Sequence, residues 1–237
     1  MRASSSPHTK SASAVYVTLA AQVAATAALV VFEQARGRRL VQEISALGGD
    51  PHAPGAQAVV GAVSVFAILI MLVTATTVAA AAAYLTWLIQ TRQNASPGAQ
   101  TAPVLAAWSV PGINLVAPPV LVHRLWWDSR PPADRHGRWV ALLAAWWLSW
   151  LAVLALVLLR LTAAGDTAAG DTDLTGLGPA ELAVVTLCAL LCAATVRQIT
   201  RIQAAGARPR PPARTGPVMA RILAEQDSAQ QVHHARR

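Results

Sequence analysis

Five residues near the middle of the chain carry cationic or hydrogen-bonding side chains in an otherwise apolar setting, which makes them the candidates for binding chemistry. They are Arg92, Asn94, Asn114, Arg124 and Trp126. Guanidinium groups bind phosphate and carboxylate groups through charge-assisted hydrogen bonds. The set therefore predicts a pocket that faces the cytoplasm and binds a lipid headgroup or a protein partner.

A structural role accounts for the same five residues. Asn114 would satisfy backbone groups where prolines interrupt the chain, Arg92 and Arg124 would extend toward lipid headgroups, and Trp126 would act as an anchor. Both interpretations stay open on the sequence alone, and the structural interpretation is the simpler of the two.

Motifs for catalysis and metal binding are absent from the sequence. There is no HExxH, GxSxG or phosphate-binding loop, and the six histidines are scattered without ligand-like spacing. Cys188 and Cys192 lie one helical turn apart, which does not suit a disulfide, and no histidine accompanies them as a zinc ligand. We therefore expect no enzyme activity, no catalytic residue, no metal and no cofactor.

The composition indicates a membrane protein. Apolar residues make up 54% of the chain and charged residues 13%, against about 25% charged in an ordinary soluble domain. The net charge of +8 comes from short arginine runs that flank apolar segments, as the positive-inside rule describes, so we expect no nucleic-acid partner. Arginine accounts for all but one of the 19 basic residues, which is typical of high-GC bacterial genomes and indicates a bacterial plasma (inner) membrane.

Four apolar runs are long enough to cross a bilayer of about 30 Å. The sequence predicts spans at about residues 14–32, 58–89, 139–159 and 178–196. The second run would form a helix of about 48 Å, so it must tilt or protrude, with Tyr84 and Trp87 as interface anchors. We expect a disordered tail at residues 1–13, a membrane domain at 14–205, and an Arg/Pro-rich cytoplasmic tail at 206–237.

A fifth apolar segment, residues 103–127, contains four prolines and cannot form an uninterrupted helix. We expect a re-entrant or interfacial helical element that the other helices shelter. Between the first two spans, loop 33–57 is expected to contain a helical extension at Leu40–Leu47 that ends at Gly48. In the third span Trp139, Leu143, Trp146 and Trp150 share one face, which favours packing against neighbouring helices or a groove for a ligand.

Counting Lys and Arg does not decide whether segment 103–127 crosses the membrane. Four spans with the N-terminus inside give fifteen basic residues inside and four outside, and five spans with the N-terminus outside give the same totals. The prolines and Asn114 favour four spans. The fold class is then an all-α integral membrane protein with four transmembrane helices, a re-entrant or interfacial segment, and both termini in the cytoplasm.

The central stretch resembles a family of bacterial membrane proteins known as domain of unknown function 4328. The resemblance rests on WLIQTRQNA (Trp87–Ala95) and on W-x-x-PGINLVAPPVLVHRLW (Trp108–Trp126), and it covers about Ala58 to Val196. One departure is Pro119, where the family often carries an aromatic residue. The resemblance implies a membrane domain of several spans and supplies no activity.

These observations predict a non-enzymatic membrane protein that acts through lipid or protein interactions on its cytoplasmic face. Its expected partners are membrane lipids, with anionic headgroups at the arginine-rich tail, and a protein partner of unknown identity. The alternative is a small transporter or channel whose path follows segment 103–122, since discontinuous helices mark the binding sites of many transporters.

Overall fold

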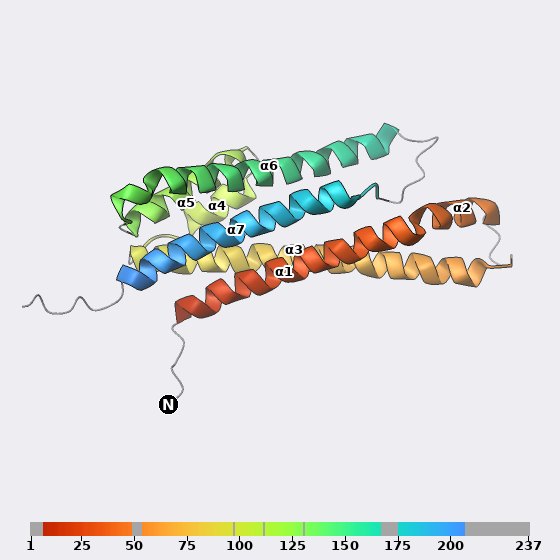
Figure 1. Cartoon of the computed structure of the whole chain (residues 1–237), viewed down its shortest axis with the longest axis horizontal. Helices are drawn as coiled ribbons and strands as arrows, with labels where there is room; N and C mark the ends of the chain where they lie inside the picture. The colour runs from red at the N-terminus through yellow and green to blue at the C-terminus, as the bar shows by residue number, and fades with distance from the viewer. Residues whose placement is uncertain are drawn as a thin grey trace, which may run out of the picture. The chain divides into compact units, whose positions relative to one another are not determined.

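The computed structural model of the chain describes residues 7–48, 54–96, 98–110, 112–129, 131–166 and 175–206 (Figure 1). Every regular element in these ranges is helical, and they contain no strand. The chain divides into two units, Met1–Gln203 and Ala204–Arg237. The first unit contains the helices described below, except for residues 204–206 at the end of the last helix. Most of the predicted basic tail, residues 207–237, lies outside the described residues.

The first span is a helix that begins earlier and ends later than its apolar run. α1 covers Pro7–Phe32, a π-helical turn follows at Glu33–Gly37, and α2 continues over Arg38–Leu47. Our expectation of disorder up to residue 13 is wrong from Pro7 onward, because proline is tolerated in the first turn of a helix and Ala12 is buried in the core.

Most of the expected loop 33–57 is likewise helical. The predicted helix at Leu40–Leu47 is confirmed as part of α2, and it stops at Gly48, whose φ of +55° gives the left-handed conformation of a helix C-cap. Leu40 packs on Val59 and Ala62 of the next helix. Because of this small apolar cluster, residues 38–47 continue the line of α1 as a helix instead of forming a loop.

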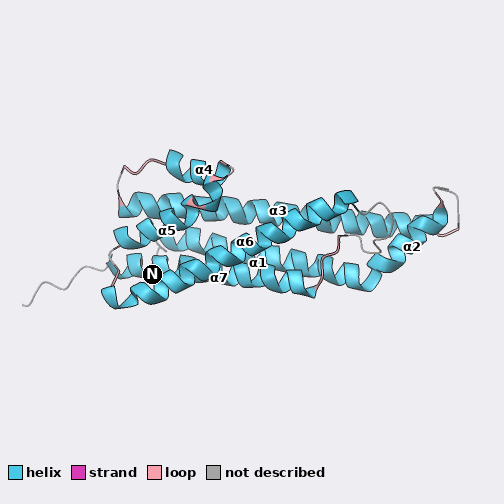
Figure 2. Ribbon diagram, turned by 90° about the horizontal axis from the view of Figure 1, so that it is seen from above, coloured by secondary structure: helices cyan, strands magenta, loops and turns pink. Residues whose placement is uncertain are grey.

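α3 runs over Ala56–Ala95 and exceeds the predicted span 58–89 at both ends. Its 40 residues form a helix of about 60 Å, twice the roughly 30 Å of a bilayer core. α1 and α3 pack along each other, as Figures 1 and 2 both show. Elsewhere α3 exposes apolar side chains such as Ile68 at 64% and Met71 at 71%, which suits contact with lipid.

The proline-broken segment forms two short helices with a single 3-10 turn between them. α4 covers Ala102–Ser109, the 3-10 turn Ile113–Leu115, and α5 Ala117–Asp128. Each short helix has proline at one of its first two positions, where the missing N–H would have had no intrahelical partner. Gly112 turns the chain between the two helices with a φ of +85°, a conformation that residues with a Cβ rarely adopt.

This segment returns to the end of the helices from which it started. Nε2 of Gln203, near the end of the last helix, donates hydrogen bonds to the carbonyl oxygen of Thr91 and to Oγ of Ser129, each at 3.2 Å. Thr91 precedes the segment and Ser129 follows it, so the chain leaves this end of the bundle and returns to it. The two ends of the segment therefore lie at the same end of the bundle, as the predicted re-entrant or interfacial element requires and a fifth span does not. The other helices do not shelter the turn of the segment as we expected, since Ile113 and Val116 are 48% and 65% exposed.

The last two long helices complete the bundle. α6 covers His136–Asp166, after a 3-10 turn at Ala133–Arg135, and α7 covers Pro179–Gly206. The predicted face of α6 is confirmed: Trp139, Leu143 and Trp146 are at most 8% exposed, and Trp150 packs beside them.

Tyr84 and Trp87 of α3 are buried, so our prediction that they are interface anchors is wrong. Their exposed fractions are 7% and 1%. Trp108 of α4 lies 5.5 Å from Tyr84 between ring centroids, and Trp146 of α6 lies 6.0 Å from it. The re-entrant helix α4 and the span α6 therefore cover a face of α3 that the sequence alone assigns to the membrane surface.

Four helices within the described residues are long and apolar enough to cross a membrane. They lie within Lys10–Leu47, Ala56–Ala95, His136–Arg160 and Pro179–Ala205. Together with the re-entrant segment, they give an all-α integral membrane protein with four transmembrane helices, as the sequence predicts.

Candidate functional site

Several helices meet at the end of the bundle where Gln203 bonds to Thr91 and Ser129, and this end carries four of the five predicted site residues. We call it the basic end. Asn114 is not among the four, because it lies at the other end of α5, in the turn that joins α5 to α4. α3, α5 and α7 finish at the basic end, and α6 begins there, because Trp126 of α5 stacks on Trp139 of α6. Figure 1 shows that α1 also starts at this end.

Arg92 and Asn94 lie in the last two turns of α3. The amide of Asn94 is exposed, whereas the Arg92 side chain is half-buried. Nη1 of Arg92 is buried and has no hydrogen-bond partner among the residues that the structure describes. A guanidinium N–H without an acceptor is costly in a sheltered position, so this atom suits an added anion.

Asn114 lies in the 3-10 turn between α4 and α5. Its backbone N–H donates to the carbonyl oxygen of Val110 at 3.0 Å, which helps to close the turn. Its side-chain Oδ1 is buried without a partner in the described part of the chain. The side chain therefore does not cap the broken backbone through Oδ1.

Arg124 and Trp126 occupy different faces of α5. Arg124 is exposed, whereas Trp126 is fully buried at 0%. The indole of Trp126 stacks on that of Trp139, with ring centroids 5.5 Å apart and an interplanar angle of 2°. Its Nε1 is a further buried donor without a partner among the described residues.

The contacts of Trp126 reveal a cluster of rings that the sequence analysis missed. His123 and Trp127 of α5 and His136 and Trp139 of α6 surround it, and the two imidazole centroids lie 5.9 Å apart. The signal was present as a repeated H-x-x-W pattern, HRLW from His123 and HGRW from His136. A polar, proline-containing turn separates the two copies, so only the fold of that turn brings them together.

His123 stands between two indole donors. Its Nδ1 accepts from Nε1 of Trp139 at 3.2 Å, and its Nε2 accepts from Nε1 of Trp127 at 3.1 Å. A neutral imidazole has one acceptor nitrogen, so the two bonds exclude each other at any moment. The bond to Trp139 is the more sheltered, since Trp127 is 51% exposed.

Within the described residues, no group of three His, Cys, Asp or Glu side chains is close enough to hold a metal ion. What the basic end offers instead is a set of donors. Arg92 and Trp126 present buried N–H groups, and Arg124 adds an exposed guanidinium. Donors without acceptors suit an anionic or otherwise oxygen-rich ligand.

Comparison with known proteins bears on the family. No curated protein and no solved structure matches the chain. A family model described as Domain of unknown function (DUF4328) matches residues 45–201, which run from the end of α2 to the last turns of α7. This match confirms the resemblance that the central motifs indicate. The chain belongs to the family described as Domain of unknown function (DUF4328).

Proposed function

We propose that this protein is a non-enzymatic component of the bacterial plasma (inner) membrane that binds anionic lipid headgroups at its basic end. The N- and C-termini would lie on the cytoplasmic side, together with that end. Arg92 is the central ligand in this proposal, with Asn94, Arg124 and Trp126 as further contacts. Asn114 is not one of them, because it lies at the other end of α5.

The distribution of charge along the helices supports the orientation. The described residues of the basic end include seven basic side chains and two acidic ones, Asp128 and Asp134. The basic residues are Lys10, Arg92, Arg124, Arg135, Arg138, Arg197 and Arg201. The opposite end has four of each sign among the described residues. Basic residues near membrane spans collect on the cytoplasmic side, where anionic lipids also attract them.

The observation that carries the proposal is the unpaired Nη1 of Arg92. Ion pairs between described residues, Arg36–Glu43 and Arg160–Glu181, belong to the opposite end. A lipid phosphate would supply the acceptor that Nη1 of Arg92 lacks among the described residues, and guanidinium groups match phosphate oxygens in geometry as well as charge. The arginine-rich tail, which lies outside the described residues, would add to this attraction.

The experiment measures which lipids stay with the protein. The full chain would be purified in a mild detergent and its retained lipids identified by mass spectrometry. We expect phosphatidylglycerol or cardiolipin with the wild type, and about tenfold less with Arg92→Gln, because a hydrogen bond to a charged group contributes about 1.5–3 kcal/mol.

The matched control is Arg39→Gln, which removes an exposed arginine from the opposite end. It should retain as much anionic lipid as the wild type. Equal retention by Arg92→Gln and wild type, with both proteins monodisperse, would contradict headgroup binding at Arg92. A protein that remained bound to the wild type alone would point to a protein partner instead.

A transporter or channel is the second candidate. The break between α4 and α5 at Gly112 favours it, because interrupted helices supply exposed backbone groups for substrates in membrane transporters. Solute flux in proteoliposomes tests this function. Flux that Gly112→Ala abolishes would support a path along segment 103–122, and no flux would leave lipid binding as the proposal.

A further inference from the structure

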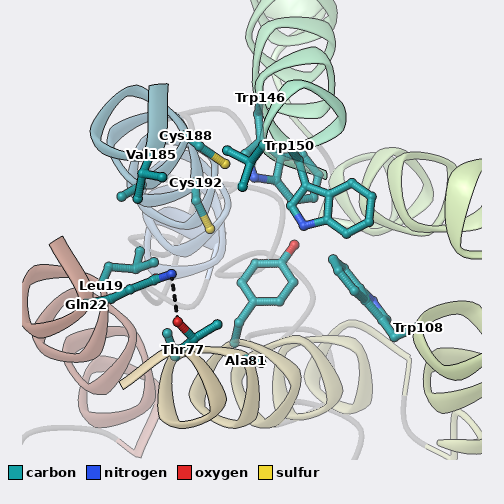
Figure 3. Close-up of a pocket in the computed structure, with 14 residues that line it drawn as sticks. Leu19, Gln22, Thr77, Ala81, Trp108, Trp146, Trp150, Val185, Cys188 and Cys192 are labelled. Carbon is teal, nitrogen blue, oxygen red and sulfur yellow. Dashed lines mark hydrogen bonds between the residues drawn. The ribbon is translucent and has the colours of Figure 1, made fainter. Parts of the chain in front are cut away.

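A pocket of about 220 Å³ lies among five helices, and none of the residues proposed to bind headgroups lines it. Leu19 and Gln22 of α1, Trp108 of α4, and Cys188 and Cys192 of α7 face the same space in Figure 3. Trp146 and Trp150 of α6 and Tyr84 of α3 complete its aromatic wall.

The aromatic rings of this pocket hold one another in place. The centroid of Tyr84 lies 5.5 Å from that of Trp108 and 6.0 Å from that of Trp146. Trp108 in turn meets Trp150 edge to face, at 6.2 Å and 90°. Such offset and edge-to-face contacts are the favoured arrangements of aromatic side chains. The re-entrant helix α4 is thus what closes the pocket on one side.

No residue that lines the pocket carries a charge. The lining residues of α6, Trp146 to Val153, fall in the middle of the span predicted at 139–159, so the pocket lies deep in the apolar layer. A charged headgroup would find no counter-ion there and would lose its hydration. The occupant must be neutral and soluble in the bilayer.

Two residues that line the pocket carry buried hydrogen-bond donors without a partner among the described residues. The donors are Oη of Tyr84, whose side chain is only 7% exposed, and Nε1 of Trp108. Gln22, by contrast, donates to Oγ1 of Thr77 at 3.3 Å, so this pair is satisfied (Figure 3). An indole N–H can only donate. A ligand that pairs with both groups must therefore present an acceptor oxygen.

We propose that this pocket binds the flat, carbonyl-bearing ring of a lipid-soluble quinone. The ring would pack against the indoles of Trp108, Trp146 and Trp150, and a ring carbonyl oxygen would accept from Tyr84, Trp108 or both. At 220 Å³ the pocket is below the roughly 300–1,000 Å³ of sites for drug-sized ligands. It accommodates a ring system and leaves an isoprenoid chain in the surrounding bilayer.

The test uses the full chain in nanodiscs of phosphatidylcholine, titrated with a short-chain menaquinone while tryptophan fluorescence is followed. Quinones quench indole emission, and three of the lining residues are tryptophans. Tyr84→Phe keeps the ring and removes only an unpaired hydroxyl, so the fold is retained. We expect it to weaken menaquinone binding about tenfold, the effect of one lost hydrogen bond.

Tyr16→Phe is the matched control, since Tyr16 is the other tyrosine of the chain and does not line the pocket. It should bind menaquinone as the wild type does. Trp108→Phe, which removes the second donor and keeps an aromatic ring, should also weaken binding.

Three outcomes would overturn the proposal. The first is an absence of saturable quenching in the wild type. The second is menaquinone binding by Tyr84→Phe and Trp108→Phe that is as tight as in the wild type. The third is displacement of menaquinone by dioleoylglycerol at equal concentration. The last result would mean that an ester carbonyl without a ring suffices. None of these outcomes depends on Arg92 or on anionic lipid.

Discussion

The carboxylate of Glu33 links the end of the first span to the connection between α6 and α7. Its Oε1 accepts from the backbone N–H groups of Thr175 and Gly176 at 2.8 and 2.7 Å, and the hydroxyl of Thr175 bonds to Oε2. Glu33 is 4% exposed and begins the π-helical turn after α1. Single π turns are rare and redirect side chains within a helix. Here the turn accompanies a buried acidic group that bonds to the α6–α7 connection.

Removing this carboxylate should destabilise the protein. Glu33→Ala removes the acceptor of the part-buried N–H groups of Thr175 and Gly176, and a hydrogen bond to a charged group contributes about 1.5–3 kcal/mol. We expect a clear fall in the thermal unfolding midpoint in detergent. Glu43→Ala is the control, because its ion pair with Arg36 at 3.5 Å is partly exposed and is worth at most about 1 kcal/mol. Equal midpoints for both variants would show that the Glu33 bonds contribute nothing to stability.

The sequence predicts individual residues well where local chemistry decides their role. Gly48 ends a helix because of its left-handed backbone, and Trp139 and Trp146 face inward because of helical spacing. The sequence does not predict a residue's role where contact with a distant element determines it. Tyr84 is buried by Trp108 and Trp146, and His123 meets His136 only after the intervening turn has folded. Helical periodicity carries no information about which neighbour covers a face.

At the scale of elements, the turn between α4 and α5 depends on one backbone conformation. Gly112 has a φ of +85°, and an L side chain in the left-handed region costs about 1–2 kcal/mol. Gly112→Ala should therefore lower the unfolding midpoint and loosen the re-entrant segment. Gly61→Ala is the matched control in α3, where a Cβ meets nothing within 4 Å and alanine is favoured by about 1 kcal/mol. Opposite shifts in the unfolding midpoint are expected, and equal shifts would contradict the role of Gly112.

The elements themselves follow from the sequence more closely than their ends do. Apolar length identifies all four spans, and the prolines of segment 103–127 identify a helix that cannot continue. The early start of α1 at Pro7 and the continuation through Glu33–Gly37 were not predicted. Polar residues at these ends resemble loop residues until packing against neighbouring helices stabilises them.

At the scale of the whole molecule, the path of the re-entrant segment determines the number of spans, and therefore which basic residues lie on the same side of the membrane. A count of fifteen basic residues on one side of the membrane and four on the other fits either four or five spans. The bonds from Gln203 to Thr91 and Ser129 favour four spans. With four spans, the start of α1 and the end of α7 lie at the same end, which is the basic end (Figure 1). The proposed cytoplasmic location of that end rests on this arrangement and on the positive-inside rule.

Cysteine accessibility in intact cells tests this arrangement. Single cysteines at Gln100, Ser129 and Ser45 would be introduced after Cys188→Ala and Cys192→Ala, and probed with a membrane-impermeant thiol reagent. Gln100 and Ser129 flank the re-entrant helices at the basic end, whereas Ser45 is exposed on α2 at the opposite end. We expect labelling from outside at Ser45→Cys alone. Labelling at Gln100→Cys but not at Ser129→Cys would mean that segment 103–127 crosses. Labelling at both, with Ser45→Cys protected, would keep the fold and reverse its orientation, and Arg92 would then face away from the anionic cytoplasmic leaflet.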